Sequence, residues 1–416
     1  MIKKYQYHLL LVFLGLTWIS LFDFITQMSS QGVMHSDSFS YQEAAKSMCI
    51  FGSGNIYRPI LMSLITGIPY LFGYSDNDLF SFSFYVNIFC WLSTSLLLFE
   101  IFKSYLKQHI AFIATFFTFF IVGNTAHVFH LLTETIFQFI IVLVFYLLLK
   151  YYKTKEFWYL SLSLALLLSS MLVKPGSKFL AIIIALYFTK EIIKNYKSKS
   201  IIFLYGSLVM IAIQCAGMKY QFGNFTLSYI DSATYYNYLG SKAICFKFDK
   251  EYSQKDNPRA EYLYSNEAIN QKRIASADLK NQVQFNTLNL IKAYFSDLRD
   301  NTVSGNSCIE ECKNLKSRNH FYFWKNVLFD VTKWQNRIFT LIGILLSTLF
   351  LIKTYNRANV FTFVSFFILY TIVLSGISCG QGDRFHLVTF PFVILLLAKF
   401  LSETKRFKPF FEPLQK

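Results

Sequence analysis

The chain has 416 residues, of which 54% are hydrophobic and only 15% are charged, with 47 Phe and 27 Tyr. This composition excludes an ordinary soluble protein, in which about a quarter of the residues are charged. The net charge of +16 does not indicate a nucleic-acid partner, because no basic patch with base-reading chemistry accompanies it. We predict a polytopic membrane protein embedded in a lipid bilayer.

Eleven apolar segments follow one another along the chain, and most approach the ~20 residues that a helix needs to cross a bilayer. The first follows Lys3 and Lys4, is longer than a signal-peptide core and lacks a small-residue cleavage site, which predicts a retained first span. The segments are residues 8–28, 58–74, 79–102, 109–128, 132–150, 157–173, 178–193, 200–217, 337–353, 358–378 and 385–401.

The connections between these segments alternate between strongly basic and nearly uncharged. Lys and Arg mark the cytoplasmic side of a membrane protein, so the alternation holds throughout only if one apolar segment does not cross. The best candidate is 58–74, which contains Pro59, Gly67, Pro69 and Gly73. We therefore expect about ten transmembrane helices, both termini in the cytoplasm, and a juxtamembrane segment 58–74 on the outer face.

This topology divides the chain into three parts. Residues 1–217 form an N-terminal membrane module with a first outer loop at 29–78, and residues 337–416 form the last spans and a cytoplasmic tail. The hydrophilic segment 218–336 has helical apolar spacing and predicts a mostly helical extracytoplasmic cap. The expected fold class is an all-α polytopic membrane protein. Five cysteines would face an oxidising compartment: Cys49, Cys245, Cys308, Cys312 and Cys379. A disulfide of undefined pairing among Cys245, Cys308 and Cys312 is an option.

Acidic and basic side chains gather at the predicted outer edge of the membrane. Ionisable groups are costly there, so each is a functional candidate by default. On the inner side the connections are simply basic. We therefore expect a site on the outer face. The candidates are His35, Asp37, Arg58, His127, His130, Glu134, Lys174, Lys178, Asp383, Arg384 and His386.

Each candidate also has a structural explanation that the sequence leaves open. Asp37 favours the N-cap of the helix that follows, although Ser36 or Ser38 would serve as well. Arg58 and Pro59 stand where a helix begins, since proline is favoured in the first turn. In these cases the residue would shape a helix end and do no chemistry.

The remaining candidates have comparable alternatives. Glu134 could be a solvated residue at the end of a span, and Lys174 and Lys178 could extend along the membrane surface as interface anchors. His127 and His130 are three residues apart on one helix face and could supply half of a metal site, but no third ligand is evident. The prediction of a site rests on the shared placement of these groups.

Several short motifs, in this order and with this sidedness, resemble a known superfamily. They are SDSFSY (36–41), YRPIL (57–61) and LFGYS (71–75) around segment 58–74, LLTET (131–135), VKPGSKFL (173–180) and DRFHLVTFP (383–391). The pattern is similar to the polytopic glycosyltransferases of the GT-C superfamily, in the style of the aminoarabinose–lipid A and protein O-mannosyl transferase families. The resemblance covers about residues 1–225 and 375–400.

The resemblance implies a transferase of the bacterial inner membrane that acts in cell-envelope biosynthesis on the extracytoplasmic face. The donor would be a polyprenyl-phosphate sugar, and the acceptor a glycan, lipid or protein. Relatives often carry two adjacent acidic residues in the first outer loop, whereas this chain has Asp37 followed by Ser38. This departure argues against a role that needs a carboxylate pair, metal binding included, and leaves a divalent cation, Mg²⁺ or Mn²⁺, as an open option for a cofactor. The implied catalytic residues are Asp37 and Glu134, with Tyr41, Arg58, Lys174, Lys178, Arg384 and His386 binding substrate.

In the expected mechanism, Asp37 takes the proton of the acceptor hydroxyl, and burial at the membrane edge raises its pKa toward neutrality. The outer-face cations would stabilise the departing lipid phosphate. Two alternatives remain: a polysaccharide polymerase or ligase that uses lipid-diphosphate-linked glycans, and a transporter or flippase. A transporter would predict polar residues near span centres and an internal repeat, neither of which we find in the sequence.

Overall fold

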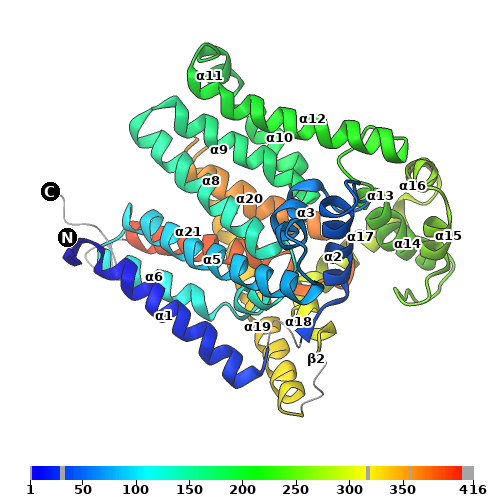
Figure 1. Cartoon of the computed structure of the whole chain (residues 1–416), viewed down its shortest axis with the longest axis horizontal. Helices are drawn as coiled ribbons and strands as arrows, with labels where there is room; N and C mark the ends of the chain where they lie inside the picture. Colours follow the sequence, from blue (N-terminus) through cyan, green and yellow to red (C-terminus); the bar gives the residue numbers. More distant parts are fainter. Residues whose placement is uncertain (1, 29–32, 315–318, 356–357, 405–416) are drawn as a thin grey trace.

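The computed structural model describes residues 2–28, 33–314, 319–355 and 358–404, and its regular structure is almost entirely helical (Figure 1). The first part of the chain contains α1 (Ile2–Thr26), α2 (Ser36–Cys49), α3 (Ile60–Thr66), α4 (Ile68–Leu71), α5 (Asp76–Lys103), α6 (Gln108–Phe117), α7 (Val122–Ala126), α8 (Glu134–Thr154), α9 (Phe157–Ser169), α10 (Lys178–Tyr187), α11 (Thr189–Lys194) and α12 (Ile202–Phe222). The second contains α13 (Ile230–Thr234), a π-helical turn (Tyr235–Leu239), α14 (Gly240–Lys247), α15 (Pro258–Ser265), α16 (Ala268–Phe285), α17 (Thr287–Val303), α18 (Ser307–Glu311), α19 (Asn319–Lys353), α20 (Val360–Ser375) and α21 (Phe390–Glu403).

Several of these helices are candidate membrane spans. Within the described residues, five are long and apolar enough to cross a membrane: Tyr5–Thr26, Asp76–Lys103, Glu134–Thr154, Lys199–Phe222 and His320–Lys353. A sixth span results if the pair Gln108–Phe120 and Val122–Phe129, bent by 67°, is counted as one. Shorter apolar helices cover Phe157–Leu172, Pro175–Tyr187 and Val360–Ser375. An all-helical, multi-pass membrane protein is thereby confirmed, while the count of about ten spans stays a prediction.

Segment 58–74 folds as the two short helices α3 and α4 and is not among the candidate spans. The helices separate at Gly67, which ends α3. A Cβ atom at Gly67 would lie 2.5 Å from the Cys49 sulfur, so only glycine lets α3 approach α2 this closely. The prolines and glycines of this segment thus divide it into two short helices that both pack against α2.

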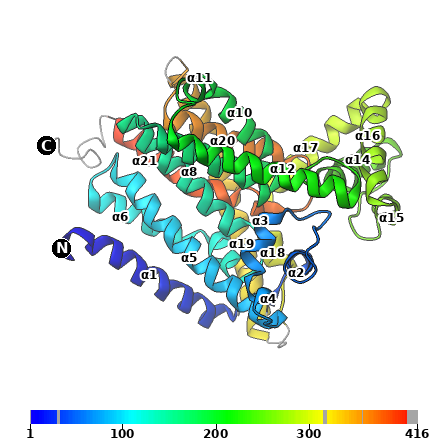
Figure 2. The same cartoon turned by 45° about the horizontal axis from the view of Figure 1, so that its top comes forward.

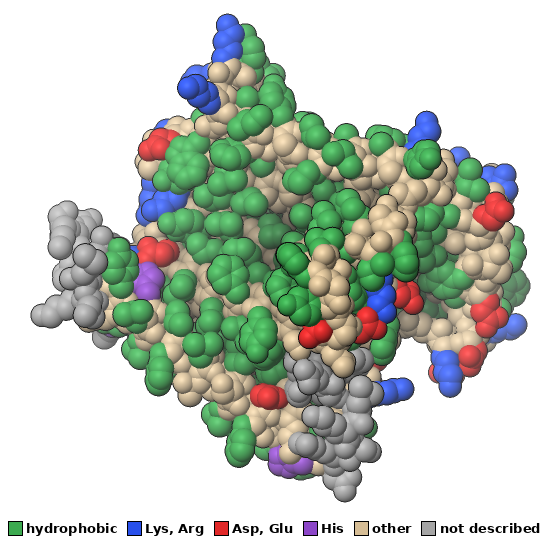
Figure 3. Space-filling model, viewed as in Figure 1, with side chains coloured by type: hydrophobic (Ala, Val, Ile, Leu, Met, Phe, Trp, Pro, Cys, Tyr) green, Lys and Arg blue, Asp and Glu red, His purple; other side chains and the backbone are tan. Residues whose placement is uncertain are grey.

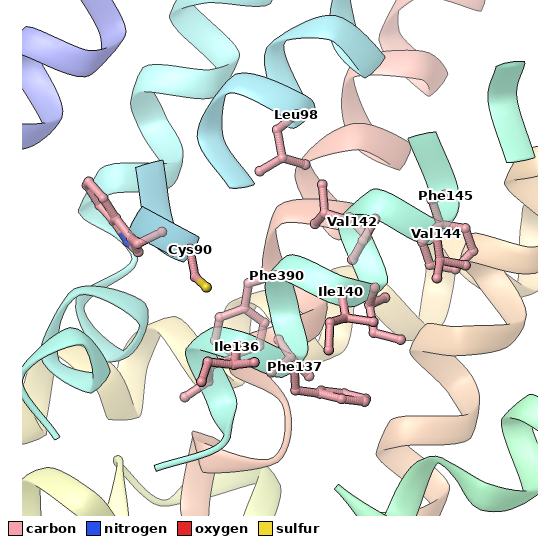
Figure 4. Packing of buried hydrophobic residues seen from close by; sticks show 14 of the residues in the cluster. Cys90, Leu98, Ile136, Phe137, Ile140, Val142, Val144, Phe145 and Phe390 are labelled. Atoms are coloured by element: carbon pink, nitrogen blue, oxygen red, sulfur yellow. The ribbon is translucent and has the colours of Figure 1, made fainter. Parts of the chain in front are cut away.

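Helix α8 forms the centre of the helix bundle, and two-thirds of its apolar stretch is buried inside the protein. Figure 4 shows its side chains in one cluster with Cys90 and Leu98 of α5 and Phe390 of α21. They include Ile136, Phe137, Ile140 and Phe145, which are all less than 9% exposed. The outer helices α1 and α12 bury far less of their apolar surface, which is expected of helices that face lipid. The site described below lies at the first turn of α8.

The two ends of the bundle differ in charge. The start of α1 and the end of α21 lie at the same end as α11 (Figure 1), where His8 contacts Glu100 at 2.8 Å and Lys353 contacts Glu403 at 3.3 Å. In Figure 3, Lys and Arg side chains lie around α11 and, mixed with Asp and Glu, over the cap, whereas hydrophobic side chains cover the face formed by the long helices. At the opposite end, α13–α18 form a helical cap.

The cap differs from expectation in two respects. Helix α19 begins at Asn319 and continues through the predicted span 337–353 without interruption, because the residues before 337 extend the helix beyond the apolar stretch. All seven cysteines are free thiols, so the disulfide considered from the sequence is not formed. Cys312, in the turn after α18, instead places its Sγ 3.1 Å from the carbonyl oxygen of Ile309.

A small contact ties the first loop to the cap. The two-residue strands β1 (Val33–Met34) and β2 (Lys313–Asn314) pair in antiparallel register. Beside them, the His35 ring contacts Glu311 at 3.2 Å, and the Ser36 hydroxyl donates to the same carboxylate at 2.9 Å. These contacts fix the start of α2, which carries Asp37.

Candidate functional site

Six of the eight predicted site residues form one network at the cap end of the bundle. They come from segments far apart in the sequence: α2, the turn before α3, the first turn of α8, the turn after α9 and the turn before α21. The helix packing around α8 brings these segments together. The six residues are Asp37, Tyr41, Arg58, Glu134, Lys174 and Arg384.

Asp37 lies between two arginines. Its Oδ1 accepts a hydrogen bond from Arg58 Nη2 at 2.9 Å, and its Oδ2 contacts Arg384 Nη1 at 2.7 Å. The cap of α2 is neither Asp37 nor an adjacent serine but His35, whose ring Nδ1 accepts from the Asp37 amide at 3.1 Å. The capping alternatives considered from the sequence are therefore wrong, and the Asp37 carboxylate is free to form ion pairs.

Arg58 uses its whole guanidinium group. Besides Asp37, it donates through Nε to Ser40 Oγ at 2.9 Å and through Nη1 to the Tyr41 hydroxyl at 3.0 Å. Its central carbon lies 4.1 Å from the centre of the Tyr41 ring, a cation–π distance. Since all three acceptors lie on α2, this helix orients the arginine as one unit. Ser40 was not among the predicted site residues.

Glu134 begins α8 and is 2% exposed, so it is not a solvated end residue. Its Oε1 accepts from Arg384 Nε at 2.9 Å and from Lys174 Nζ at 3.2 Å, and its Oε2 lies 3.7 Å from His127 Nδ1. A buried carboxylate needs such partners to remain ionised. The Lys174 side chain is 17% exposed, and its Nζ lies 5.3 Å from the centre of the Phe385 ring, so it is not a simple surface anchor.

Arg384 joins the two halves of the network, because its Nη1 contacts Asp37 and its Nε contacts Glu134. The turn that carries it is held by Asn301 of α17. The Asn301 side chain donates to Ser375 O at 2.8 Å and accepts from the amides of Gln381 and Gly382 at 2.9 and 3.1 Å. No sequence signal points to Asn301, because an asparagine in a helix has no motif that reveals a tertiary role.

The electrostatics of Asp37 differ from expectation. Burial raises the pKa of its carboxyl group, but the adjacent Arg384 and Arg58 outweigh burial and hold that pKa well below its usual range. The predicted rise toward neutrality is therefore wrong for the protein without substrate. Near Arg384 lies a contrasting acid, since burial without a compensating cation raises the pKa of Asp383 to about 8.

Two predicted residues lie outside the network. Lys178 pairs with Asp231 of the cap at 3.6 Å, and both side chains are substantially exposed. His386 is fully buried, with its ring nitrogens 2.9 Å from Ser375 Oγ and 3.1 Å from Asn336 Oδ1. These contacts give His386 a packing role between α19 and α20.

The network does not suit a divalent cation. Both carboxylates already bond to Arg384, whose charge occupies the position that a metal ion would need. Over the part of the chain that the structure describes, no group of three His, Cys, Asp or Glu is arranged to hold a metal. His127 and His130 are both buried, and neither ring nitrogen of His130 has a hydrogen-bond partner. We therefore assign no step to a cation.

A cavity of about 200 Å³ adjoins the network between α2, the segment 52–60 and the cap-end half of α12. Its lining is mostly small or apolar, with Ala44 and Met48 on one side and Ile213 and Met218 on the other. Arg58 is the charged residue in this lining and connects the cavity to Asp37. The cavity thus has an apolar wall next to a candidate membrane span and a cationic end.

The network carries more positive than negative charge. Arg58, Lys174 and Arg384 supply three cations, whereas Asp37 and Glu134 supply two carboxylates. Such an arrangement can accept an anionic group with little rearrangement. Comparisons with protein-family models, curated proteins and solved structures find no match to this chain. The function must therefore be inferred from the chemistry of the site.

Proposed function

We propose that the protein is a GT-C-type integral-membrane glycosyltransferase. It would move a sugar from a polyprenyl-phosphate donor to a glycan, lipid or protein acceptor at the extracytoplasmic face of a bacterial inner membrane. The observation that carries this proposal is the cation-rich clamp around Asp37, which opens onto an apolar-walled cavity beside α12. An anionic headgroup on a long apolar tail matches both halves of that site.

The charge distribution supports the proposed orientation. The connections that are rich in Lys and Arg lie at the end opposite the cap, as in the region of α11. Under the positive-inside rule that end is cytoplasmic, with both termini inside and about ten spans. The network and the cap then lie outside, where a lipid carrier presents its sugar after translocation.

Arg58 and Arg384 are suited to bind the donor phosphate. A guanidinium group makes two parallel hydrogen bonds to phosphate oxygens, which fixes orientation as well as charge. In the substrate-free protein these groups are held by Asp37. A phosphate would compete for the same N–H groups and leave Asp37 less strongly paired. The pKa of its carboxyl group would then rise, so donor binding would itself prepare the base.

The chemical step follows from this arrangement. The acceptor hydroxyl oxygen forms a bond to the anomeric carbon while its proton passes to the Asp37 carboxylate. The bond between the anomeric carbon and the phosphate oxygen breaks, and the lipid phosphate leaves with the electron pair. The arginines and Lys174 stabilise the negative charge that develops there. Attack opposite the phosphate inverts the anomeric centre, with no covalent glycosyl-enzyme.

Glu134 would act by positioning. Its contacts at 2.9 and 3.2 Å fix Arg384 and Lys174 relative to each other, and its burial keeps it away from bulk water. This role explains why a buried carboxylate is useful at the start of a membrane helix. Tyr41 supports Arg58 in the same way from α2.

The decisive experiment compares lipid-linked sugars in cells that carry the wild-type chain or Asp37→Asn. We expect one polyprenyl-phosphate sugar to accumulate in the variant at normal protein level, because the isosteric amide cannot accept the proton. Asp231→Asn is the matched control, since Asp231 is an exposed acid of the cap paired with Lys178 and should retain transfer. Unchanged lipid-linked sugars in both the Asp37 variant and a deletion strain would refute the proposed function.

A further inference from the structure

Helix α17 of the cap presents an unpartnered apolar stripe. Leu288, Ile291 and Phe295 are spaced by three and four residues and therefore lie on one face of the helix. They are 83%, 48% and 60% exposed, which is unusual for three large apolar side chains in a row. The opposite face carries Ala293 and Asp297 and is buried in the cap. The helix is amphipathic, with its apolar side directed outward.

The position of α17 relative to the membrane helices shows what faces this stripe. The Tyr294 hydroxyl donates to the carbonyl oxygen of Val373, near the end of the apolar helix α20, at 2.8 Å. The Tyr294 ring lies directly on Gly376, where a Cβ atom would approach it to 2.5 Å. Val373 itself is 57% exposed. Helix α17 is thus tightly packed at the level where α20 leaves the apolar layer.

The order of residues around α17 is that of a helix at a membrane surface. Successive residues are about 100° apart, since a turn contains 3.6 residues. Starting from the side that contacts α20, this spacing gives the order Tyr294, Thr287, Leu298, Ile291, Thr302, Phe295 and Leu288, then Arg299 and Lys292, so the two threonines at the ends of the helix are the only polar residues within the apolar sector. The apolar sector therefore begins at the contact with α20, and basic side chains border its far edge, where long cationic side chains can reach lipid headgroups.

We propose that α17 lies in the interface of the bilayer and inserts this stripe among the lipid headgroups and upper acyl chains. Such helices bury their apolar face by roughly 5–10 Å. The apolar sector begins at Tyr294, whose hydroxyl contacts the carbonyl oxygen of the exposed Val373 of α20, and the basic border suits lipid phosphates. Figure 2 shows α16 and α17 extending from the bundle near the cap end of α12. This proposal does not depend on the transferase activity.

The arrangement also connects the membrane surface to the candidate site. The last turn of the same helix contains Asn301, which holds the turn that carries Arg384. Lipid contact at one end of α17 would therefore stabilise the position of an arginine at the other end. In this view the cap is anchored to the bilayer by its own helix as well as by the spans that flank it.

Site-specific photo-crosslinking tests the proposal. The full chain, with benzoyl-phenylalanine at position 291 or 295, is reconstituted into nanodiscs of phosphatidylethanolamine and phosphatidylglycerol, irradiated and analysed by mass spectrometry. We expect lipid adducts at both positions, several-fold above those at position 262 of α15, where Tyr262 is 54% exposed in the cap. Position 288, the most exposed of the three, provides a further probe if either variant is not monodisperse.

The products distinguish the alternatives. Lipid adducts at 291 and 295 but not at 262 support the proposal. A lipid yield no higher than that at position 262 would overturn it. A crosslinked dimer would instead assign the stripe to a second copy of the chain, and would equally overturn it.

Discussion

Two partly buried ion-pair networks in this protein are built from the same kind of contact but differ in their balance of charge. At the candidate site, Asp37 and Glu134 share Arg384, with Arg58 and Lys174 at the two sides. In the cap, one cation serves two acids. Lys242 of α14 contacts Asp297 at 2.7 Å and Asp300 at 3.0 Å, both on α17. The site therefore has an excess of cations, and the cap cluster an excess of acids.

The difference appears in the acids themselves. Arginines hold the pKa of Asp37 well below its usual range despite burial. In the cap, burial outweighs Lys242 and raises the pKa of Asp297 to about 6. A site that binds an anion benefits from surplus positive charge next to its cavity. An ion-pair cluster that only holds two helices together can contain an acid that is partly protonated near physiological pH.

The largest effect is expected when the shared cation of the site is removed. Arg384→Met leaves Asp37 and Glu134 without their common partner, and breaking a buried ion pair in this way costs about 3–5 kcal/mol. We expect a large fall in the unfolding temperature of the purified protein in detergent, together with complete loss of sugar transfer.

The control for this variant is Lys353→Met. Lys353 pairs with Glu403 at the opposite end of the bundle, where both side chains are about 40% exposed or more. Its unfolding temperature should stay close to that of the wild type, because exposed pairs contribute little. Equal unfolding temperatures for Arg384→Met and the wild type would contradict the assigned network.

Much of the membrane architecture could be predicted because apolar length and loop charge are strong, local signals. The same reasoning placed Asp37, Arg58, Glu134, Lys174 and Arg384 on one side, and the structure brings these five into contact. A residue that is assigned to one side of the membrane can lie only in a thin layer of the molecule. Within that layer, opposite charges that are removed from water are expected to pair.

The sequence could not show which charged groups contact one another. Whether Asp37 meets a cation, a helix end or an apolar wall decides the direction of its pKa shift, and only the packing of α2 against the turn before α21 determines this. The role of Asn301 was hidden for the same reason. The extension of α19 to Asn319 was also missed, because residues 319–336 lack the continuous apolar run that marks a span.

A second, smaller effect is expected in the cap. Lys242→Met removes charge-assisted hydrogen bonds to Asp297 and Asp300, which are worth about 1.5–3 kcal/mol for a bond to a charged group. The loss should fall in the lower part of that range because Asp297 can take up a proton. We expect a moderate fall in unfolding temperature but unchanged transfer per folded molecule. Loss of transfer in a variant that is still folded would show that the two networks are functionally coupled.

The two networks should also respond to pH with opposite sign. The folded-state pKa of Asp297, about 6, lies above the ordinary value of 3.8. Between pH 4 and 6 the unfolded chain loses this proton while the folded protein keeps it. The free energy of unfolding therefore falls as pH rises, by up to about 1.4 kcal/mol per pH unit. Asp37 behaves oppositely, since its stabilising contribution is present above pH 3.8 and is lost on acidification.

Asp297→Asn isolates the contribution of this one group. Unfolding temperatures measured between pH 4 and 6.5 should decline less steeply with rising pH in the variant than in the wild type, while Lys242 keeps its bond to Asp300. If unfolding temperature changed with pH in the same way in the two proteins, Asp297 would be ionised throughout this range. The pKa shifts of Asp37 and Asp297 would then not be opposite in direction.

The smallest effect on stability is expected for a substitution at Lys178. Comparing it with a substitution at Lys174 tests where the site ends. Lys174 and Lys178 are four residues apart in sequence, yet Lys174 contacts buried Glu134 at 3.2 Å whereas Lys178 pairs with Asp231 at 3.6 Å in an exposed setting. Exposed pairs contribute about 0–1 kcal/mol, so Lys178→Met should change neither unfolding temperature nor transfer appreciably.

Lys174→Met should abolish transfer, because Glu134 and the donor phosphate lose the same cation. If the two variants lost transfer equally, the phosphate site would extend to the edge of the cap and include the exposed pair.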